Sequence, residues 1–226
     1  MAKPALAIMS RIPSAEGKSR LSGVLTPAQR EALQWAFLED TLDKVRRLTE
    51  FKSYIAATPA GEINKLAKVV GPDEEVIPQP EGSLGQRMLG VAGQLFVRGH
   101  SPVVLIGTDT PALPPSFLIK TLYLLDQSDL VFGPAFDGGY YLVGMRYFEG
   151  RVFDDIDWGT ESVLEKTLTI CDKYNVTYSL LDRLSDVDRP DDLLAMTEQF
   201  ERQQIDFMPI NKRTSQFLKF IRRAKA

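Results

Sequence analysis

Asp109 stands where an apolar segment of strand length ends. Residues 103–106 are all aliphatic, and only Gly107 and Thr108 separate them from Asp109. Open α/β sheets bind ligands just outside the carboxyl ends of their strands, so a carboxylate here is a candidate for metal binding or catalysis. The alternative is an aspartate that only forms or caps a turn, since prolines follow at positions 111 and 114.

A second acidic cluster, residues 186–190, lies between another strand-like segment and a helix-like one. Asp188 is its central carboxylate. Two distant carboxylates at one sheet edge would suit Mg²⁺, which binds a few carboxylates together with phosphate oxygens and water. Asp188 could equally serve as an N-cap for a helix that begins at Pro190.

A basic loop, residues 10–21, follows the first apolar segment. It contains Arg11, Lys18, Ser19 and Arg20 beside Gly17. Cationic side chains and flexible backbone amides in such a loop suit a phosphate group. Surface charges on a solvated loop are the alternative. A P-loop is excluded, because that motif needs a glycine at the place of Ile12.

Two glycine-containing segments are further candidates for ligand contact. Gly85 lies in a segment that opens a helix, whose first amides can bind a nucleotide or be satisfied by simple capping. Asp137, Gly138 and Gly139 join two apolar segments, either at a ligand or as a tight hairpin turn. Trp158 precedes a further helix and could form a substrate wall or a packing contact.

Strand-like and helix-like segments alternate along the chain. This pattern predicts a single-domain α/β fold with a mostly parallel sheet and helices on both faces. The helix after the basic loop has Thr26 as N-cap, Pro27 at its first position, and an apolar face that includes Phe37. We predict strands at 5–9, 53–57, 75–77, 103–106, 130–133, 140–144 and 176–180, and helices near 27–46, 62–68, 84–95, 115–125, 160–168 and from 190.

The domain is predicted to span residues 1–204, followed by a basic tail at 205–226 that forms a short helix. Such a helix could dock on a partner subunit or an anionic surface, but we favour a solvated or loosely packed helix.

Composition narrows the class of protein. The 226 residues are 44% hydrophobic and 25% charged, with a net charge of −3. This balance predicts a globular protein that does not bind long nucleic acid. The chain has one histidine and one cysteine, which argues against a Ser-His-Asp relay, a zinc site or disulfides. No leader or long apolar stretch is evident, so we expect a cytoplasmic protein without a membrane span. A homo-oligomer is possible.

Five segments, in order, resemble the bacterial glycosyltransferase A or radical-SAM-associated transferase 1 family. They are residues 18–21, 82–88, 107–111, 137–142 and 186–193, within a resemblance that covers about residues 4 to 200. The family has the nucleotide-diphospho-sugar transferase fold (GT-A, Rossmann-like) and is related to the molybdenum-cofactor and 2-phospholactate guanylyltransferases. This chain differs in its basic loop, where Ala15-Glu16 replaces a usual Pro-Gly pair, and at Phe136 and Arg189.

The resemblance implies roles for the candidate residues. Lys18 and Arg20 would meet the nucleotide phosphates, and Asp109 and Asp188 would hold Mg²⁺ or Mn²⁺. From the resemblance and the residue patterns together, we predict three groups of site residues. Lys18, Arg20 and Asp109 are catalytic; Arg11, Lys18, Ser19, Arg20, Gly85 and Thr108 bind the nucleotide; and Asp137, Gly138, Gly139 and Trp158 bind the acceptor.

We therefore expect a metal-dependent transferase that moves a sugar from a nucleotide sugar to a small-molecule acceptor. The alternative is a nucleotidyltransferase, in which an acceptor oxygen attacks the α-phosphorus of a nucleoside triphosphate and pyrophosphate leaves. A hypothesis of another class is a nucleotide-binding regulator or scaffold without catalysis, which the altered basic loop would favour.

Overall fold

The computed structural model describes residues 2–202 and 211–223. Its contacts divide the chain into two compact units. The first, called the sheet unit here, comprises Met1–Ile12, Leu48–Gly107 and Leu113–Leu184; the second, called the helical unit, comprises Pro13–Arg47, Thr108–Ala112 and Ser185–Ala226.

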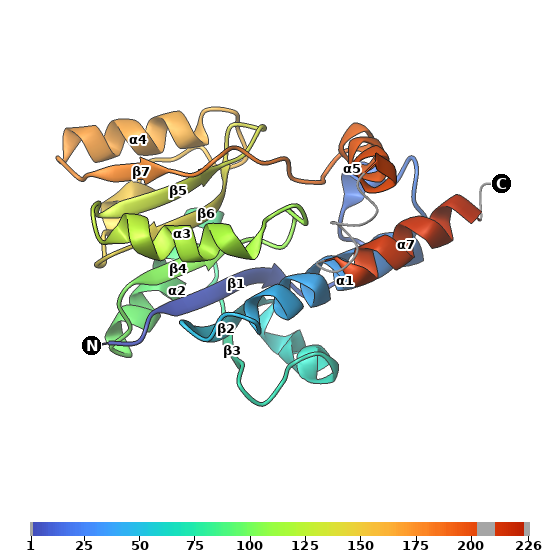
Figure 1. The fold of residues 1–226 in the computed structure, drawn as a ribbon, viewed down its shortest axis with the longest axis horizontal. Helices are drawn as coiled ribbons and strands as arrows, with labels where there is room; N and C mark the ends of the chain where they lie inside the picture. Colours follow the sequence, from blue (N-terminus) through green and yellow to red (C-terminus); the bar gives the residue numbers. More distant parts are fainter. Residues whose placement is uncertain (1, 203–210, 224–226) are drawn as a thin grey trace. The chain divides into compact units, whose positions relative to one another are not determined.

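The sheet unit has one seven-stranded sheet in the order β3-β2-β1-β4-β6-β5-β7 (Figure 1). All neighbouring strands are parallel except at β6, which is antiparallel to β4 and β5. The predicted mostly parallel α/β fold is therefore confirmed. The strands are β1 (Ala5–Arg11), β2 (Lys52–Thr58), β3 (Glu75–Pro78), β4 (Val103–Ile106), β5 (Leu130–Pro134), β6 (Tyr140–Met145) and β7 (Tyr178–Leu180).

Helices cover both faces of this sheet. On one face, Ala5, Val103 and Val143 pack with residues of α2 (Leu84–Val97) and α4 (Val163–Lys173) in a common core. Successive strand residues point to opposite faces, so Gly144 faces the other side. There α3 (Pro115–Leu125) packs closely: a Cβ at Gly144 would lie 2.8 Å from Thr121 Cγ2. Short 3₁₀ helices, η2 (Ala60–Lys68) and η3 (Gly150–Phe153), complete the unit.

The helical unit is built on α1 (Pro27–Val45), whose predicted start is confirmed. Thr26 and Gln29 form a reciprocal capping box, and Pro27 occupies the first helical position. The unit also contains the 3₁₀ helix η1 (Ser19–Leu21), α5 (Pro190–Arg202) and α7 (Lys212–Arg223). Their apolar side chains form one core, which includes Leu21, Leu33, Phe37, Val187, Leu193, Phe217, Leu218 and Ile221.

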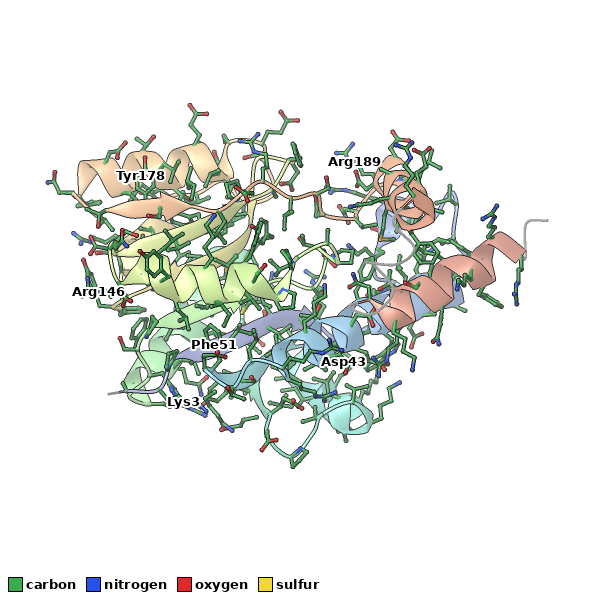
Figure 2. All side chains as sticks on the ribbon, viewed as in Figure 1. Lys3, Asp43, Phe51, Arg146, Tyr178 and Arg189 are labelled. Atoms are coloured by element: carbon green, nitrogen blue, oxygen red, sulfur yellow. The ribbon has the colours of Figure 1, made fainter. Side chains whose placement is uncertain are left out.

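The prediction of a solvated or loosely packed C-terminal helix was wrong. Helix α7 lies beside α1 (Figure 1), and its apolar side chains at positions 217, 218 and 221 are buried. The backbone N–H groups of Arg213 and Thr214 donate to the Asp40 carboxylate at 2.9 and 2.8 Å. The Arg213 guanidinium pairs with Glu39 and with Asp43, which is labelled in Figure 2. The predicted boundary between residues 204 and 205 lies outside the described residues.

Within residues 2–202 and 211–223, no helix is long and apolar enough to cross a membrane.

Candidate functional site

The Lys18 ammonium lies between the two carboxylates predicted to bind metal. Its Nζ is 2.9 Å from Asp109 Oδ1 and 3.7 Å from Asp188 Oδ1, and it donates to the Val187 carbonyl at 2.6 Å. The Lys18 side chain is only 5% exposed. The structure therefore brings together three predicted site residues that are up to 170 positions apart (188 − 18) in the sequence.

Lys18 has an unusual backbone conformation. Lys18 has φ 49°, in the left-handed region, where a residue with a side chain is strained by about 1–3 kcal/mol. It is the N-cap residue of η1, so the turn places Ser19 and Arg20 directly after it. The Lys18 Nζ also lies 5.8 Å from the centre of the Phe37 ring, within the range of a cation–π contact.

Two α1 side chains that the sequence analysis missed support the basic loop. Arg30 is buried and donates to the carbonyls of Gly17, Leu25 and Ala15 at 3.1, 3.3 and 2.7 Å. Gln34 donates to the Ser14 carbonyl at 2.8 Å. The sequence contained a sign of this role. Positions 30 and 34 lie beside Leu33 on the apolar face of the predicted helix, so polar side chains there should be buried and hydrogen-bonded.

The segment that carries Asp109 is held from two sides. The Asp109 carbonyl accepts a hydrogen bond from the Val187 N–H at 2.8 Å. Lys44, which was also missed, donates from Nζ to the Pro111 carbonyl at 2.5 Å. Lys44 is buried, and burial lowers its pKa to about 8, although the nearby Asp40 carboxylate acts in the opposite direction.

Asp188 does not act as the predicted alternative, a helix N-cap. Instead Asp192 accepts the N–H groups of Asp188 and Arg189 at 3.0 and 2.7 Å, near the start of α5, where Arg189 is labelled in Figure 2. The Asp188 carboxylate pairs with Arg20 as well as Lys18. Helix α5 begins at Pro190, as predicted.

The Asp109 and Asp188 oxygens fit a divalent cation that also binds phosphate. One Oδ1 from each converges on a single positive charge, the Lys18 ammonium. No group of three or more His, Cys, Asp or Glu side chains able to hold a metal exists in the described part of the chain. Mg²⁺ commonly binds to one or two carboxylates and takes its remaining ligands from water and substrate phosphates. Asp109 is 53% exposed and can contact such a ligand.

Other predicted nucleotide residues have less defined surroundings. Ser19 is exposed in η1, and Thr108 Oγ1 is 3.5 Å from Asp109 Oδ1. Arg11 is exposed at the end of β1 in the sheet unit. Their roles stay predictions.

Gly85 and Trp158, predicted for the nucleotide and the acceptor, are in contact in the sheet unit. A Cβ at Gly85 would lie 2.5 Å from Trp158 Nε1. The Trp158 indole also packs against Tyr140 and Phe153, with ring centres 6.1 and 6.4 Å away. Trp158 therefore has a packing role, whereas a role toward the acceptor stays a prediction.

Asp137, Gly138 and Gly139 form the hairpin turn between β5 and β6, the alternative weighed from the sequence. Asp137 Oδ1 accepts the Gly139 N–H at 2.9 Å. Gly138 has φ 89°, and a Cβ there would lie 2.0 Å from the Glu161 carbonyl oxygen. Gly138 is therefore required because the backbone of Glu161 lies so close to it. Binding of the acceptor by this turn stays a prediction.

Comparison with known families shows which family the chain belongs to. Residues 41–160 match the family described as "Uncharacterized protein conserved in bacteria (DUF2064)", and this match covers more than half of the chain. The chain belongs to the DUF2064 family. Asp109, Gly85 and Trp158 lie within the matched region of this DUF2064 protein, while Lys18 and Asp188 lie outside it.

Two curated relatives are guanylyltransferases. The chain is 32% identical over 138 residues to a 3-phospho-D-glycerate guanylyltransferase of Phenylobacterium zucineum (strain HLK1), over 57% of this chain and 61% of the relative. It is 31% identical over 114 residues to a phosphoenolpyruvate guanylyltransferase of Streptomyces scabiei (strain 87.22), over 49% of this chain and 53% of that relative. The matches therefore span less than two thirds of either relative.

Solved structures establish the fold. A provisionally named nucleotide-diphospho-sugar transferase from Desulfovibrio desulfuricans G20 is 28% identical, with a TM-score of 0.86 over 98% of this chain and 99% of its own. A CMP:2-keto-3-deoxy-manno-octonic acid synthetase complexed with CTP has a TM-score of 0.59 at 11% identity, over 90% of this chain and 100% of its own. The DUF2064 protein has the fold of these transferases, as predicted; the narrower family named from the motifs stays a prediction.

Proposed function

We propose that this DUF2064 protein is a metal-dependent nucleotidyltransferase that transfers a nucleoside monophosphate, most readily guanylyl, to a small phosphorylated acid. The observation that carries the proposal is the contact of the buried Lys18 ammonium with Asp109 and Asp188. The guanylyltransferase relatives support nucleotidyl transfer over the glycosyl transfer expected from the sequence.

In the proposed reaction, an oxygen of the acceptor attacks the α-phosphorus of the triphosphate. The bond from that phosphorus to the bridging oxygen breaks, and pyrophosphate leaves with the electron pair. Lys18 and Arg20 would neutralise charge on the phosphates, and Asp109 and Asp188 would hold Mg²⁺ or Mn²⁺. The metal ion, when bound, supplies electrostatic stabilisation of charge that develops on the phosphate oxygens.

Lys18 would have to exchange partners during this cycle. Its ammonium now neutralises the two carboxylates that would bind the metal. An ammonium on a flexible four-carbon side chain can turn to a phosphate oxygen without moving its backbone. The hydrogen bonds that Arg30 and Gln34 donate to the basic loop would then keep the Lys18 Cα in place while the charged end moves between carboxylate and phosphate.

Glycosyl transfer is the second candidate, because the similar protein from Desulfovibrio desulfuricans G20 carries a sugar-transferase name and matches nearly the whole chain. In that reaction the same charges would stabilise a nucleoside diphosphate as it leaves. The regulator or scaffold hypothesis predicts nucleotide binding without turnover.

One assay separates these functions. The protein is incubated with GTP, ATP, CTP or UTP and either 3-phospho-D-glycerate or phosphoenolpyruvate, with Mg²⁺, Mn²⁺ or a chelator. Pyrophosphate release and the mass of the product are measured, and nucleotide sugars are tested in parallel. Metal-dependent pyrophosphate release with a nucleotidylated acid is the expected result. Release of a nucleoside diphosphate from a nucleotide sugar, or binding without turnover, would contradict it.

Asp109→Asn tests the residue assignment, with Asp73→Asn as the control. Asp73 lies in an exposed turn of the sheet unit and is not one of the carboxylates that pair with Lys18. The Asp109 variant should lose turnover while it remains folded, and the Asp73 variant should keep it. Wild-type turnover in Asp109→Asn would overturn the metal assignment.

A further inference from the structure

Two guanidinium groups face one edge of the sheet unit without an acidic partner. Arg11 is the last residue of β1, and Arg87 lies in the first turn and a half of α2. Within the described residues, no carboxylate lies within ion-pair distance of either group. Exposed arginines often lack partners, but the Nε atom of Arg87 is buried and makes no hydrogen bond.

A buried glutamine connects the strands at this edge. Gln79 directly follows β3, and its side-chain amide donates to the Ser10 carbonyl of β1 at 3.1 Å and the Ala56 carbonyl of β2 at 2.6 Å. Its Oε1 accepts a long hydrogen bond from Arg87 Nη1 at 3.4 Å. Because β1, β2 and β3 are parallel, their carboxyl ends share one edge, where ligands of such sheets bind.

The positive charges of Arg11 and Arg87 also repel each other. Burial lowers the pKa of Arg87, and the positive charge of Arg11 lowers it further. A half-buried guanidinium with an unpaired N–H beside a like charge is unfavourable unless an anion accepts its hydrogen bonds. The planar guanidinium group matches phosphate geometry better than an ammonium does.

We propose that Arg11 and Arg87 form a binding subsite for a phosphate-type oxyanion at the carboxyl edge of β1, β2 and β3. Gln79 positions Arg87 and fixes the edge. Arg11 was predicted to meet the nucleotide, whereas Arg87 is a new assignment. The choice of ligand rests on the proposed function: the oxyanion is either a phosphate of the triphosphate or the phosphate of the acceptor.

Calorimetry with defined probes tests the subsite. Binding of tripolyphosphate, 3-phospho-D-glycerate and phosphoenolpyruvate is measured for the wild type, Arg87→Gln, Arg87→Lys, Arg11→Gln and the double variant Arg11→Gln/Arg87→Gln. Arg47→Gln, at an exposed position beyond α1, is the control. Arg87→Gln should weaken at least one probe by about tenfold or more, and Arg87→Lys should restore part of that affinity. The Arg11 and Arg87 effects should be non-additive, since one anion contacts both.

The pattern of loss identifies the ligand. Weaker tripolyphosphate binding alone assigns the subsite to the nucleotide, and weaker binding of the phosphorylated acids alone assigns it to the acceptor. Unchanged affinity for every probe in a folded Arg87→Gln, or a loss equal to that of Arg47→Gln, would overturn the subsite. Arg87-dependent anion binding without turnover would leave the subsite standing and refute the proposed function instead.

Discussion

Lys44→Met should change the dependence of stability on pH. Burial lowers the pKa of Lys44 in the folded protein to about 8, from its ordinary value of 10.5. Between these values the unfolded chain binds more protons than the folded one, so the contribution of Lys44 to stability rises with pH. A shift of one pKa unit corresponds to about 1.36 kcal/mol, so the free energy of unfolding should increase by about 3 kcal/mol over the whole pH range. About 2 kcal/mol of this increase should occur between about pH 7.5 and 9.5.

Methionine has a similar volume and no charge, so it removes this pH dependence with little change in packing. At about pH 7.5 the substitution has two opposite effects on the free energy of unfolding. The variant avoids the cost of a buried charge, but it leaves the Pro111 carbonyl without its Lys44 donor, at about 1–3 kcal/mol. The absolute stabilities should therefore lie within about 2 kcal/mol at that pH, and the slope is the informative quantity.

Urea unfolding of both proteins at several pH values measures this slope. Burial raises the pKa of the Cys171 thiol to about 12, and it raises the pKa of Tyr141 as well, so alkaline pH destabilises both proteins alike through these groups. The difference between wild type and variant cancels that shared effect. Lys120→Met, at an exposed position on α3, is the control and should give a flat difference. A flat difference for Lys44→Met would refute the argument that burial disfavours its charge.

Three further variants test the site. Asp109→Asn should abolish turnover and weaken metal-dependent nucleotide binding without unfolding the protein, as calorimetry and circular dichroism would show. Lys18→Met should weaken triphosphate binding by about tenfold and leave binding of the bare nucleoside unchanged. In a metal titration, Mn²⁺ alone should bind more tightly to the variant, because the Lys18 ammonium no longer occupies the two carboxylates. Equal losses of triphosphate and nucleoside binding would argue against a phosphate role for Lys18. Gly85→Ala should destabilise the protein by about 1–3 kcal/mol, because its Cβ overlaps the Trp158 indole; an unchanged melting temperature would show that the indole moves freely.

Local patterns in the sequence were enough to place Asp109 and the start of α1. Asp109 follows a short aliphatic strand, and Thr26 and Pro27 carry their own start signal, so neither depends on distant residues. The contact of Lys18 with Asp188 could be expected only from the shared sheet edge and the resemblance, because no local rule relates residues this far apart.

The errors have the same physical origin. Glu39 and Asp43 lie at positions of α1 where a local amphipathic pattern predicts contact with solvent. The structure pairs both with Arg213 of α7. Lys44 was missed because a lysine on a helix is usually exposed, and its burial depends on the Pro111 carbonyl, 67 positions away. Contacts between distant polar residues leave no periodic signal in either segment.

The Lys18 cluster is electrically balanced. Lys18 and Arg20 carry two positive charges, and Asp109 and Asp188 carry two negative charges, which sum to zero. A free divalent ion therefore meets no net attraction, and a free triphosphate meets carboxylates as well as cations. Under the proposed function, a metal–triphosphate complex would bring both charges at once, so the metal ion would meet the carboxylates while the phosphates meet Lys18 and Arg20. We expect an order of addition in which metal and nucleotide arrive together, with a shallow dependence of association on ionic strength.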